Sequence, residues 1–148
     1  ERIKLEEKAT KKEKESVLSG VPKSLPALIK AIRIQEKARG IGFDWDDTTQ
    51  VLAKVEEEME ELNQAIAQKE GQDRIEEEFG DLLFALINYG RFIDVNPETA
   101  LEKCNKKFIR RFSFIEKSAK KNGQVLANMT LAEMEEYWQE AKKIEKKV

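Results

Sequence analysis

An acidic pattern that occurs twice places the strongest constraint on how this chain can fold. Residues 55–62 read Val-Glu-Glu-Glu-Met-Glu-Glu-Leu, and residues 75–82 read Ile-Glu-Glu-Glu-Phe-Gly-Asp-Leu. In both segments the first, fifth and eighth residues are apolar, which is the spacing of one face of an α-helix. The residue before each segment is basic, Lys54 in one case and Arg74 in the other. The repeat therefore predicts two neighbouring helices with the same arrangement of charged and apolar side chains.

Each of these helices is expected to carry two acidic residues at the edge of its apolar face. At about 100° per residue, Glu58 and Glu61 fall on one side of the first apolar stripe. Glu78 and Asp81 take the same two positions beside the second stripe. If the helices pack antiparallel, the four carboxylates face one another. The stripes themselves are expected to be buried, and they consist of Val55, Met59, Leu62 and Ile66 in the first helix and Ile75, Phe79, Leu82 and Leu86 in the second.

Four converging carboxylates indicate a metal site built from oxygen ligands. Without a counter-charge their repulsion raises at least one pKa, and one or two divalent cations remove that repulsion. The chain has no histidine and one cysteine, so the site selects Mg²⁺, Mn²⁺ or Ca²⁺. The alternative is that the glutamates form ordinary solvated helix faces. Asp81 argues against it, because Asp81 stands in an otherwise apolar run where an unpaired charge is costly.

The remaining sequence predicts further helices and no strand of useful length. Ser24 is a candidate N-cap for the first helix, with Pro26 in its first turn. Thr130 and Glu133 form the pattern of a capping box for the last helix. Residues 1–24 are interpreted as a linker or N-terminal arm and residues 25–148 as one all-α domain, a bundle of about five helices. The expected helices cover about residues 25–39, 46–70, 73–93, 96–122 and 130 to near the C-terminus.

Several classes of function are excluded by what the sequence lacks. With no histidine, a Ser-His-Asp triad and a His-ligated zinc site are impossible. The seven glycines never form a phosphate-binding P-loop. The 27 basic and 29 acidic residues nearly cancel, so no direct nucleic-acid binding is expected. No apolar run reaches the length of a membrane span, and the single cysteine fits a reducing, cytoplasmic setting.

Several blocks of the sequence resemble one family. The paired motif ExxE, a spacer, then ExxD is the signature of the all-α NTP pyrophosphatase superfamily, and the closer match is to its MazG-type nucleoside triphosphate pyrophosphohydrolases. The resemblance covers nearly the whole chain. It is carried by residues 24–28, 34–38, 42–45, 76–84, 105–112 and 134–138.

This resemblance implies an activity and an assembly. The activity is the Mg²⁺-dependent hydrolysis of nucleoside triphosphates to nucleoside monophosphate and pyrophosphate, with Mn²⁺ as a second possible cofactor and Glu58, Glu61, Glu78 and Asp81 as the metal ligands. The family is dimeric, so we expect the bundle to be completed by a homodimer. Residues 1–24 resemble the segment that follows the first domain in tandem-domain relatives, which implies that this chain is a second, C-terminal domain.

A triphosphate substrate requires cations, and four basic residues are candidates. Lys107 and Arg111 are four residues apart on one predicted helix face and match basic positions of the family motif. The alternative for this pair is a solvated basic face. Lys54 and Arg74 precede the acidic pairs by one turn. They either contact phosphates or pair with the glutamates, and the sequence does not decide between these two roles.

Four other residues are candidates for catalysis or substrate binding. Glu57 is the candidate general base, since a carboxylate must replace the missing histidine, although a solvated glutamate is the alternative. Asn88 lies two turns beyond Asp81 and is a candidate substrate ligand or an amide at the edge of the core. Trp138 is the first candidate for stacking on the base and Trp45 the second, each with plain core packing as the alternative.

Two other functions remain open at this point. One is a narrower relative that acts on dUTP or dCTP. The other is a non-catalytic helical interaction domain. Metal-dependent release of pyrophosphate from a panel of nucleoside triphosphates separates them, because an interaction domain releases none.

Overall fold

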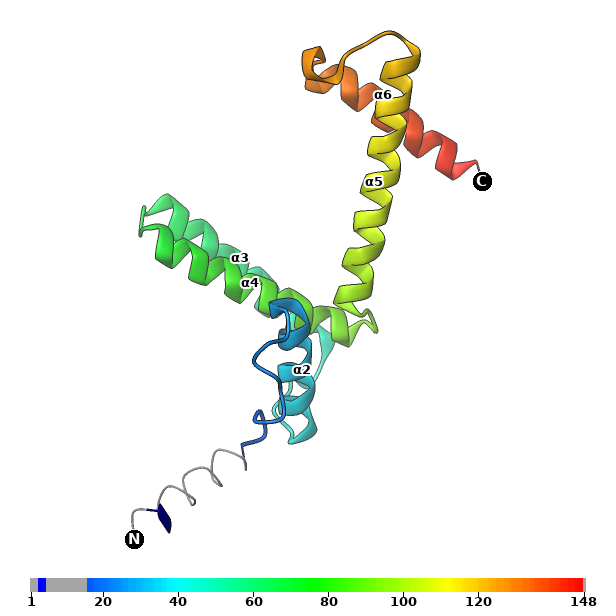
Figure 1. Ribbon diagram of the computed structural model, residues 1–148. Helices are drawn as coiled ribbons and strands as arrows, with labels where there is room; N and C mark the ends of the chain where they lie inside the picture. Colours follow the sequence, from blue (N-terminus) through cyan, green and yellow to red (C-terminus); the bar gives the residue numbers. More distant parts are fainter. Residues whose placement is uncertain (1–2, 5–15, 148) are drawn as a thin grey trace. The chain divides into compact units, whose positions relative to one another are not determined.

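The computed structural model describes residues 3–4 and 16–147, and within this part of the chain it contains helices and no strand. The predicted all-α fold class is confirmed. Two compact units, residues 1–98 and residues 99–148, make up the chain. Much of the predicted arm at residues 1–24 lies outside the described residues. The elements, labelled in Figure 1, are α2 (Ala27–Gly40), α3 (Thr48–Ala67), α4 (Gln72–Phe92), α5 (Pro97–Lys121), the short 3-10 helix η1 (Leu126–Asn128) and α6 (Leu131–Lys146).

The helix starts follow from capping chemistry, with one exception to the predictions. The Asp47 side chain accepts a hydrogen bond of 3.0 Å from the Gln50 backbone N–H and caps α3. Thr130 and Glu133 form the predicted capping box of α6. The predicted Ser24 cap is wrong, because α2 begins at Ala27 with Pro26 as its N-cap and no side-chain cap. Proline pushes the preceding residue toward extended backbone, so the helix does not extend back beyond Pro26.

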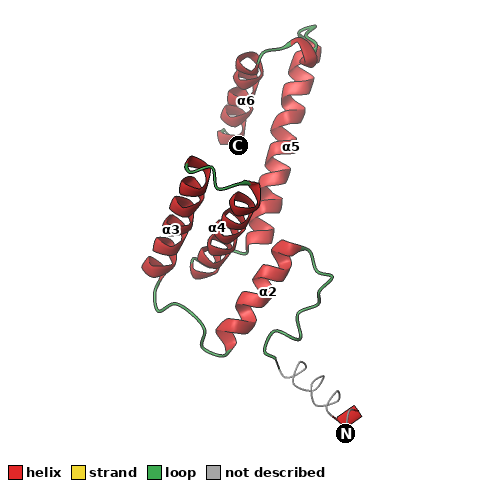
Figure 2. Ribbon diagram, turned by 90° about the vertical axis from the view of Figure 1, so that its left-hand side faces the viewer, coloured by secondary structure: helices red, strands yellow, loops and turns green. Residues whose placement is uncertain are grey.

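A tight turn joins α3 and α4 into an antiparallel hairpin, visible in Figure 2. Helix α3 ends at Ala67, earlier than the predicted end at residue 70. The chain then turns through two residues with positive φ, Lys69 at 52° and Gly71 at 99°. The Glu70 backbone N–H donates to the Ala65 carbonyl over 3.1 Å and closes the end of the helix. The positive φ at Gly71 is a conformation that glycine adopts with little cost.

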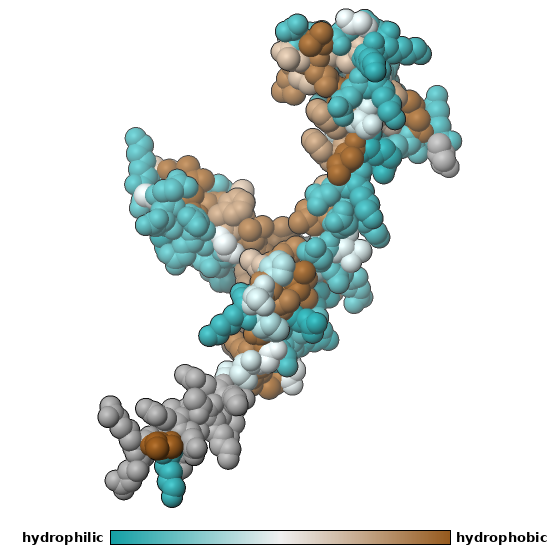
Figure 3. All heavy atoms as spheres, in the orientation of Figure 1, coloured by the Kyte–Doolittle hydropathy of each residue, from teal (hydrophilic) through white to brown (hydrophobic). Residues whose placement is uncertain are grey.

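The buried faces of this hairpin differ from the predicted apolar stripes. Ala65 is 1% exposed and Ala85 8%, and the carboxylate-bearing residues Glu58 and Glu78 are buried as well. The buried face of each helix is therefore made up partly of other residues than the predicted stripe. Four of the eight side chains that were predicted to be buried are instead about half exposed. Figure 3 shows hydrophobic residues on the surface of the hairpin. They are Met59 (46%), Ile66 (52%), Phe79 (52%) and Leu86 (50%).

Helix α2 and the loop after it are tied to α4. Gln35 is 6% exposed and donates from Nε2 to the Phe84 carbonyl over 2.9 Å. In the loop, Asp44 accepts hydrogen bonds of 3.2 and 2.9 Å from Nη1 and Nη2 of Arg91. These contacts join segments that are far apart in the sequence. Together α2, the loop, α3 and α4 form the first unit.

The second unit consists of α5, η1 and α6, and side-chain contacts join its two long helices. Arg110 and Arg111 both donate to Glu145, over 3.0 Å and over 2.9 and 3.1 Å respectively. The rings of Phe108 and Trp138 lie 5.4 Å apart between centroids. Among the described residues, no helix is both long enough and apolar enough to cross a bilayer.

A candidate metal centre between α3 and α4

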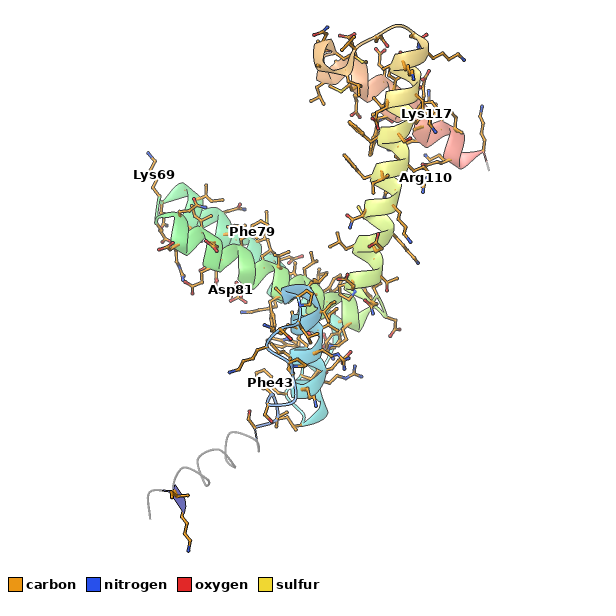
Figure 4. All side chains as sticks on the ribbon, viewed as in Figure 1. Phe43, Lys69, Phe79, Asp81, Arg110 and Lys117 are labelled. Carbon is orange, nitrogen blue, oxygen red and sulfur yellow. The ribbon has the colours of Figure 1, made fainter. Side chains whose placement is uncertain are left out.

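Three carboxylates from the two halves of the hairpin meet at one point. Oxygen atoms of Glu58, Glu78 and Asp81 all lie within 4.8 Å of one another. Glu58 is 7% exposed and Glu78 2%, whereas Asp81 is exposed. Figure 4 shows Asp81 leaving α4 on the side opposite to Phe79, as expected for residues about 200° apart on a helix. The predicted convergence of these three carboxylates is present in the structure.

Each buried glutamate is bound on one side by a cation from its own helix. Lys54 Nζ lies 3.1 Å from Glu58 Oε1, and Arg74 Nη2 lies 2.6 Å from Glu78 Oε1. Both pairs span four residues, so the repeated sequence pattern produces a repeated contact. The second oxygen of each glutamate, Oε2, is buried and has no hydrogen-bond partner within the described protein.

These two oxygens indicate what the site can hold. A buried anionic oxygen without a partner is costly, and buried polar atoms are normally paired. The exposed Asp81 leaves one side of the cluster open. All donors are carboxylate oxygens, which Mg²⁺ and Mn²⁺ prefer. The residues present therefore fit a divalent cation bound through Glu58, Glu78 and Asp81.

Glu61, the fourth predicted ligand, is partly exposed and electrostatically coupled to the cluster. The charge of Glu58 raises the pKa of Glu61, with smaller contributions from desolvation and from the charge of Glu78. Its oxygens are not in the group that lies within 4.8 Å. Glu61 thus lies outside the three-carboxylate group and interacts with it through charge.

The two candidate phosphate ligands of the hairpin are paired with glutamates in the structure. Besides Glu58, Lys54 lies 3.4 Å from Glu57. The hydrogen bond to Glu58 is the main cause of the raised pKa of Lys54. The charge of Glu78 raises the pKa of Arg74. Both side chains therefore stay positively charged beside the cluster.

The candidate base Glu57 is not one of the three clustered carboxylates, but Lys54 contacts both Glu57 and the clustered Glu58. The Glu57 side chain is 55% exposed, and its carboxylate is paired with Lys54. This is the position that a helical wheel gives it.

A cavity of about 710 Å³ opens beside the metal centre. Helix α2, the loop at residues 41–45 and helix α4 line it together with Val17 and Leu18, and Lys54, Glu58 and Asp81 form part of its wall. Asn88 and Trp45, both singled out in the sequence, line it too. The remaining lining is mostly apolar.

Sequence reasoning missed two residues of this cavity, Asp44 and Arg91. Hydrogen bonds from Arg91 hold the pKa of Asp44 below its usual value. Arg91 also donates to the Asn88 amide oxygen over 2.6 Å. No local signal identifies a pair of residues this far apart in the sequence, although an acidic loop residue and a basic residue at a helix end are each visible.

The second unit contains the other three candidates. Lys107 is exposed. The side chain of Arg111 is 14% exposed, bound to Glu145 and stacked over the Trp138 ring at 5.2 Å. Hydrogen bonds from Arg111 and then Arg110 lower the pKa of Glu145. Trp138 therefore packs against an arginine.

Comparison with known proteins gives one consistent result. Residues 47–113 match the model of the MazG nucleotide pyrophosphohydrolase domain. Over 142 residues the chain is 44% identical to the nucleoside triphosphate pyrophosphohydrolase/pyrophosphatase MazG of Thermotoga maritima, covering 96% of this chain and 53% of that protein. Over 149 residues it is 42% identical to the nucleoside triphosphate pyrophosphohydrolase of Escherichia coli K12, covering 98% and 55%.

A further relative has a name that states no activity. The uncharacterized protein YabN of Bacillus subtilis is 46% identical over 147 residues, which cover 99% of this chain and 30% of that protein. The chain thus spans about half the length of the first two relatives and less of the third.

Proposed function

The chain belongs to the MazG nucleotide pyrophosphohydrolase family, and from this premise we propose that it hydrolyses nucleoside triphosphates to nucleoside monophosphate and pyrophosphate with Mg²⁺ as cofactor. The observation that carries the proposal is the pair of buried, unpartnered oxygens on Glu58 and Glu78 beside Asp81. Glutamates on a solvated helix face would not bury two such oxygens. A bound cation would stabilise these buried oxygens, so their burial fits a metal site.

Four carboxylates hold the metal in this proposal: Glu58, Glu61, Glu78 and Asp81. Glu58 and Glu78 are fixed by burial and by their intrahelical cations, so they form the rigid part of the site. Asp81 and Glu61 are the more exposed members and adjust to the ion. When bound, Mg²⁺ or Mn²⁺ would offset charge on the phosphate oxygens and make the attacking water more acidic.

Four basic residues bind the triphosphate in this proposal. Lys54 and Arg74 are proposed because they lie beside the cluster. When the triphosphate binds, each would release its glutamate oxygen and contact a phosphate oxygen instead. Lys107 and Arg111 are proposed because they match the family motif and share one helix face. Glu145 and Trp138 hold the Arg111 guanidinium in a fixed plane, and a fixed planar guanidinium suits bidentate contact with phosphate.

The reaction needs one base and one leaving group. A water oxygen bonds to the α-phosphorus, and the bond from that phosphorus to the α–β bridging oxygen breaks. Pyrophosphate leaves with the electron pair. Glu57 is the proposed acceptor of the water proton, since its carboxylate is accessible and lies one residue from Glu58.

A homodimer is also part of the proposal. Its support is the half-exposed apolar face of the hairpin, which includes Met59, Ile66, Phe79 and Leu86. Several large apolar side chains left half exposed on one helical hairpin are typical of a protein–protein interface. The exposed Phe108 and Ile109 of α5 (56% and 67%) add a second apolar area.

A cytoplasmic location is proposed as well, supported by the single free cysteine, Cys104.

The test is a panel of ribo- and deoxynucleoside triphosphates incubated with Mg²⁺, Mn²⁺ or neither. We expect nucleoside monophosphate and pyrophosphate in equal amounts, and only with a metal. Turnover of dUTP or dCTP alone would favour the narrower enzyme. Release of nucleoside diphosphate and orthophosphate would contradict the reaction, and no release from any triphosphate would favour an interaction domain.

A further inference from the structure

Two neighbouring arginines of α5 converge on one glutamate of α6. Glu145 Oε1 accepts a hydrogen bond of 3.0 Å from Arg110 Nε, and Glu145 Oε2 accepts bonds of 3.1 and 2.9 Å from Nε and Nη2 of Arg111. Figure 4 shows Arg110 on α5. Both oxygens of the carboxylate are therefore occupied. Since two positive charges meet one negative charge, the cluster keeps a net positive charge although it contains a carboxylate.

The two arginines differ in how firmly they are held. The Arg110 side chain is 59% exposed, whereas the Arg111 side chain is 14% exposed. The Arg111 guanidinium also lies over the Trp138 ring, 5.2 Å from its centroid, and that ring lies 5.4 Å from the Phe108 ring. Glu145 at its edge and Trp138 at its face together fix the plane of the Arg111 guanidinium.

Arg111 keeps part of its hydrogen-bonding capacity in this arrangement. A guanidinium carries five N–H donors in a fixed planar fork. Glu145 takes the donor on Nε and one on Nη2, so both donors on Nη1 and the second donor on Nη2 bind no described residue. Two parallel donors at this end of a guanidinium match two oxygens of a phosphate. The side-on contact with Glu145 thus leaves the end-on fork for an anion.

The place of Glu145 in α6 gives it little to contribute to stability by itself. Glu145 lies in the last turn of α6, where the helix dipole disfavours a negative charge. Its partner Arg110 is exposed, and exposed ion pairs contribute little to folding. Hydrogen bonds from Arg111 and then Arg110 hold the pKa of Glu145 below its usual value, so the carboxylate stays charged at neutral pH. The main effect of the contact is therefore on the orientation of Arg111.

We propose that Glu145 is a positioning residue, which aligns the Arg111 guanidinium so that its end-on fork binds oxygens of the triphosphate. The proposal rests on the proposed function, in which Arg111 is a phosphate ligand. It extends that function to a negatively charged residue whose removal should weaken the binding of an anion. Glu145 acts through Arg111 and touches no phosphate itself. The last turn of α6 thereby becomes part of the apparatus that binds phosphate.

One substitution separates positioning from net charge by the sign of its effect. Glu145→Gln removes a negative charge beside Arg111, so electrostatics alone would tighten the binding of an anion. Loss of positioning has the opposite effect. The glutamine amide has one accepting oxygen instead of two, so it cannot bind both arginines as the carboxylate does, and the Arg111 guanidinium is no longer held in its plane.

Calorimetric titration with tripolyphosphate measures this sign without turnover. The chain is titrated in a buffer with EDTA, well below its melting temperature. We expect Glu145→Gln to bind tripolyphosphate about five- to tenfold more weakly than wild type, the effect of one lost charge-assisted hydrogen bond. Glu140→Gln, which removes the same charge at an exposed position on α6, is the matched control and should not weaken binding. Binding by Glu145→Gln as tight as by Glu140→Gln overturns the proposal, and so does a wild-type protein that binds no tripolyphosphate.

Steady-state kinetics with a nucleoside triphosphate and Mg²⁺ give a second readout. In Glu145→Gln we expect KM to rise by a similar factor and kcat to change by less than about twofold. A lower melting temperature with unchanged anion affinity and KM would mean that Glu145 only joins the two helices, which overturns the proposal. If Glu145→Gln does not fold, Glu145→Asp replaces it. This variant keeps the charge but is one methylene shorter, so weaker tripolyphosphate binding supports positioning and unchanged binding overturns it.

The two assays also separate this inference from the proposed reaction. Weaker tripolyphosphate binding by Glu145→Gln, in a protein whose wild type releases no pyrophosphate, would reject the reaction and leave the positioning role supported. Pyrophosphate release by a wild type whose anion affinity and KM do not respond to Glu145→Gln would reject only the positioning role.

Discussion

Arg74 and Glu78 form a 2.6 Å ion pair within a single helix, although Glu78 is 2% exposed and the Arg74 side chain is 48% exposed. Lys54 and Glu58 repeat this relationship on the facing helix. In each pair one carboxylate oxygen is neutralised by a cation that reaches in from solvent. The other oxygen points into the protein without a partner. The two ion pairs thus occupy one oxygen of each buried glutamate and leave the other oxygen without a partner among the described residues.

Asp81→Asn should abolish catalysis and spare the fold. The change removes charge while keeping shape, and Asp81 is exposed, so little packing is lost. We expect turnover at saturating Mg²⁺ to fall by roughly 100-fold or more, and the metal-free midpoint of thermal unfolding to stay or to rise as repulsion decreases. Glu60→Gln, on an exposed face of α3, is the control and should be nearly silent. Near-full turnover in Asp81→Asn would rule out the four-carboxylate site.

Glu78→Gln should separate metal binding from folding stability. The amide still accepts a hydrogen bond from Arg74 but no longer buries an unpaired anionic oxygen. We expect the metal-free protein to be as stable as wild type or more stable, by about 1 kcal/mol, and the rise in melting temperature on adding Mg²⁺ with nucleotide to disappear. Calorimetry with and without the metal measures both effects. Glu77→Gln, at a surface-exposed position beside it, should retain the metal-dependent rise.

The Asp44–Arg91 pair should contribute to stability in a defined range of pH. Arg91 lowers the pKa of folded Asp44 below its ordinary value of 3.8, so the folded state binds the proton less tightly than the unfolded state. The stabilisation is fully present above the unfolded pKa and is lost as the pH falls through the lower folded value. Urea unfolding from pH 6 down to about pH 2 should show a smaller acid-induced loss in Asp44→Asn than in wild type. Equal slopes would mean that the pair does not stabilise the fold.

Arg111→Lys should weaken substrate binding although the substitution keeps the positive charge. Lysine cannot make the two contacts to Glu145 or lie flat over Trp138. We expect KM for the nucleoside triphosphate to rise roughly tenfold or more and the α5–α6 unit to melt earlier. Arg110→Lys, whose side chain is 59% exposed, is the matched comparison. An equal effect of both changes would argue that only net charge matters.

Leu86→Glu should dissociate the proposed homodimer. The side chain is 50% exposed and belongs to the apolar face of the hairpin, where a charge opposes burial. Multi-angle light scattering should give a dimer mass for wild type and a monomer mass for the variant. A wild-type monomer at micromolar concentration would contradict the proposed assembly. Glu56→Gln, at an exposed site on α3, should leave the mass unchanged.

The sequence predicted the helices and the acidic cluster because both follow from periodicity. Two copies of one pattern, joined by a short turn, leave few ways for Glu58 and Glu78 to avoid each other. The capping box at Thr130 and Glu133 is equally local, and the structure confirms it.

The predictions that failed concern which side chains are buried, because helix packing determines burial. A helical wheel ranks faces by hydropathy, so the prediction placed Met59 and Phe79 in the buried stripe. Burial in the structure follows three-dimensional packing instead, and the buried residues are Val51, Glu58, Leu62 and Ala65 in α3 and Glu78, Ala85, Ile87 and Gly90 in α4. The Asp44–Arg91 pair could not be predicted, since its two partners are 47 residues apart in the sequence and no periodic pattern links them.

The turn between α3 and α4 has a consequence for how this site can change. Each residue inserted into a helix moves everything beyond it by about 1.5 Å and about 100°. One insertion between Glu58 and the turn would take its carboxylate off the shared face, and the positive φ angles at Lys69 and Gly71 leave the turn little freedom to compensate. Length variation in natural or engineered versions should therefore fall outside residues 54–81. A designer who wishes to transplant the metal centre into another helical scaffold must move that stretch as one uninterrupted block.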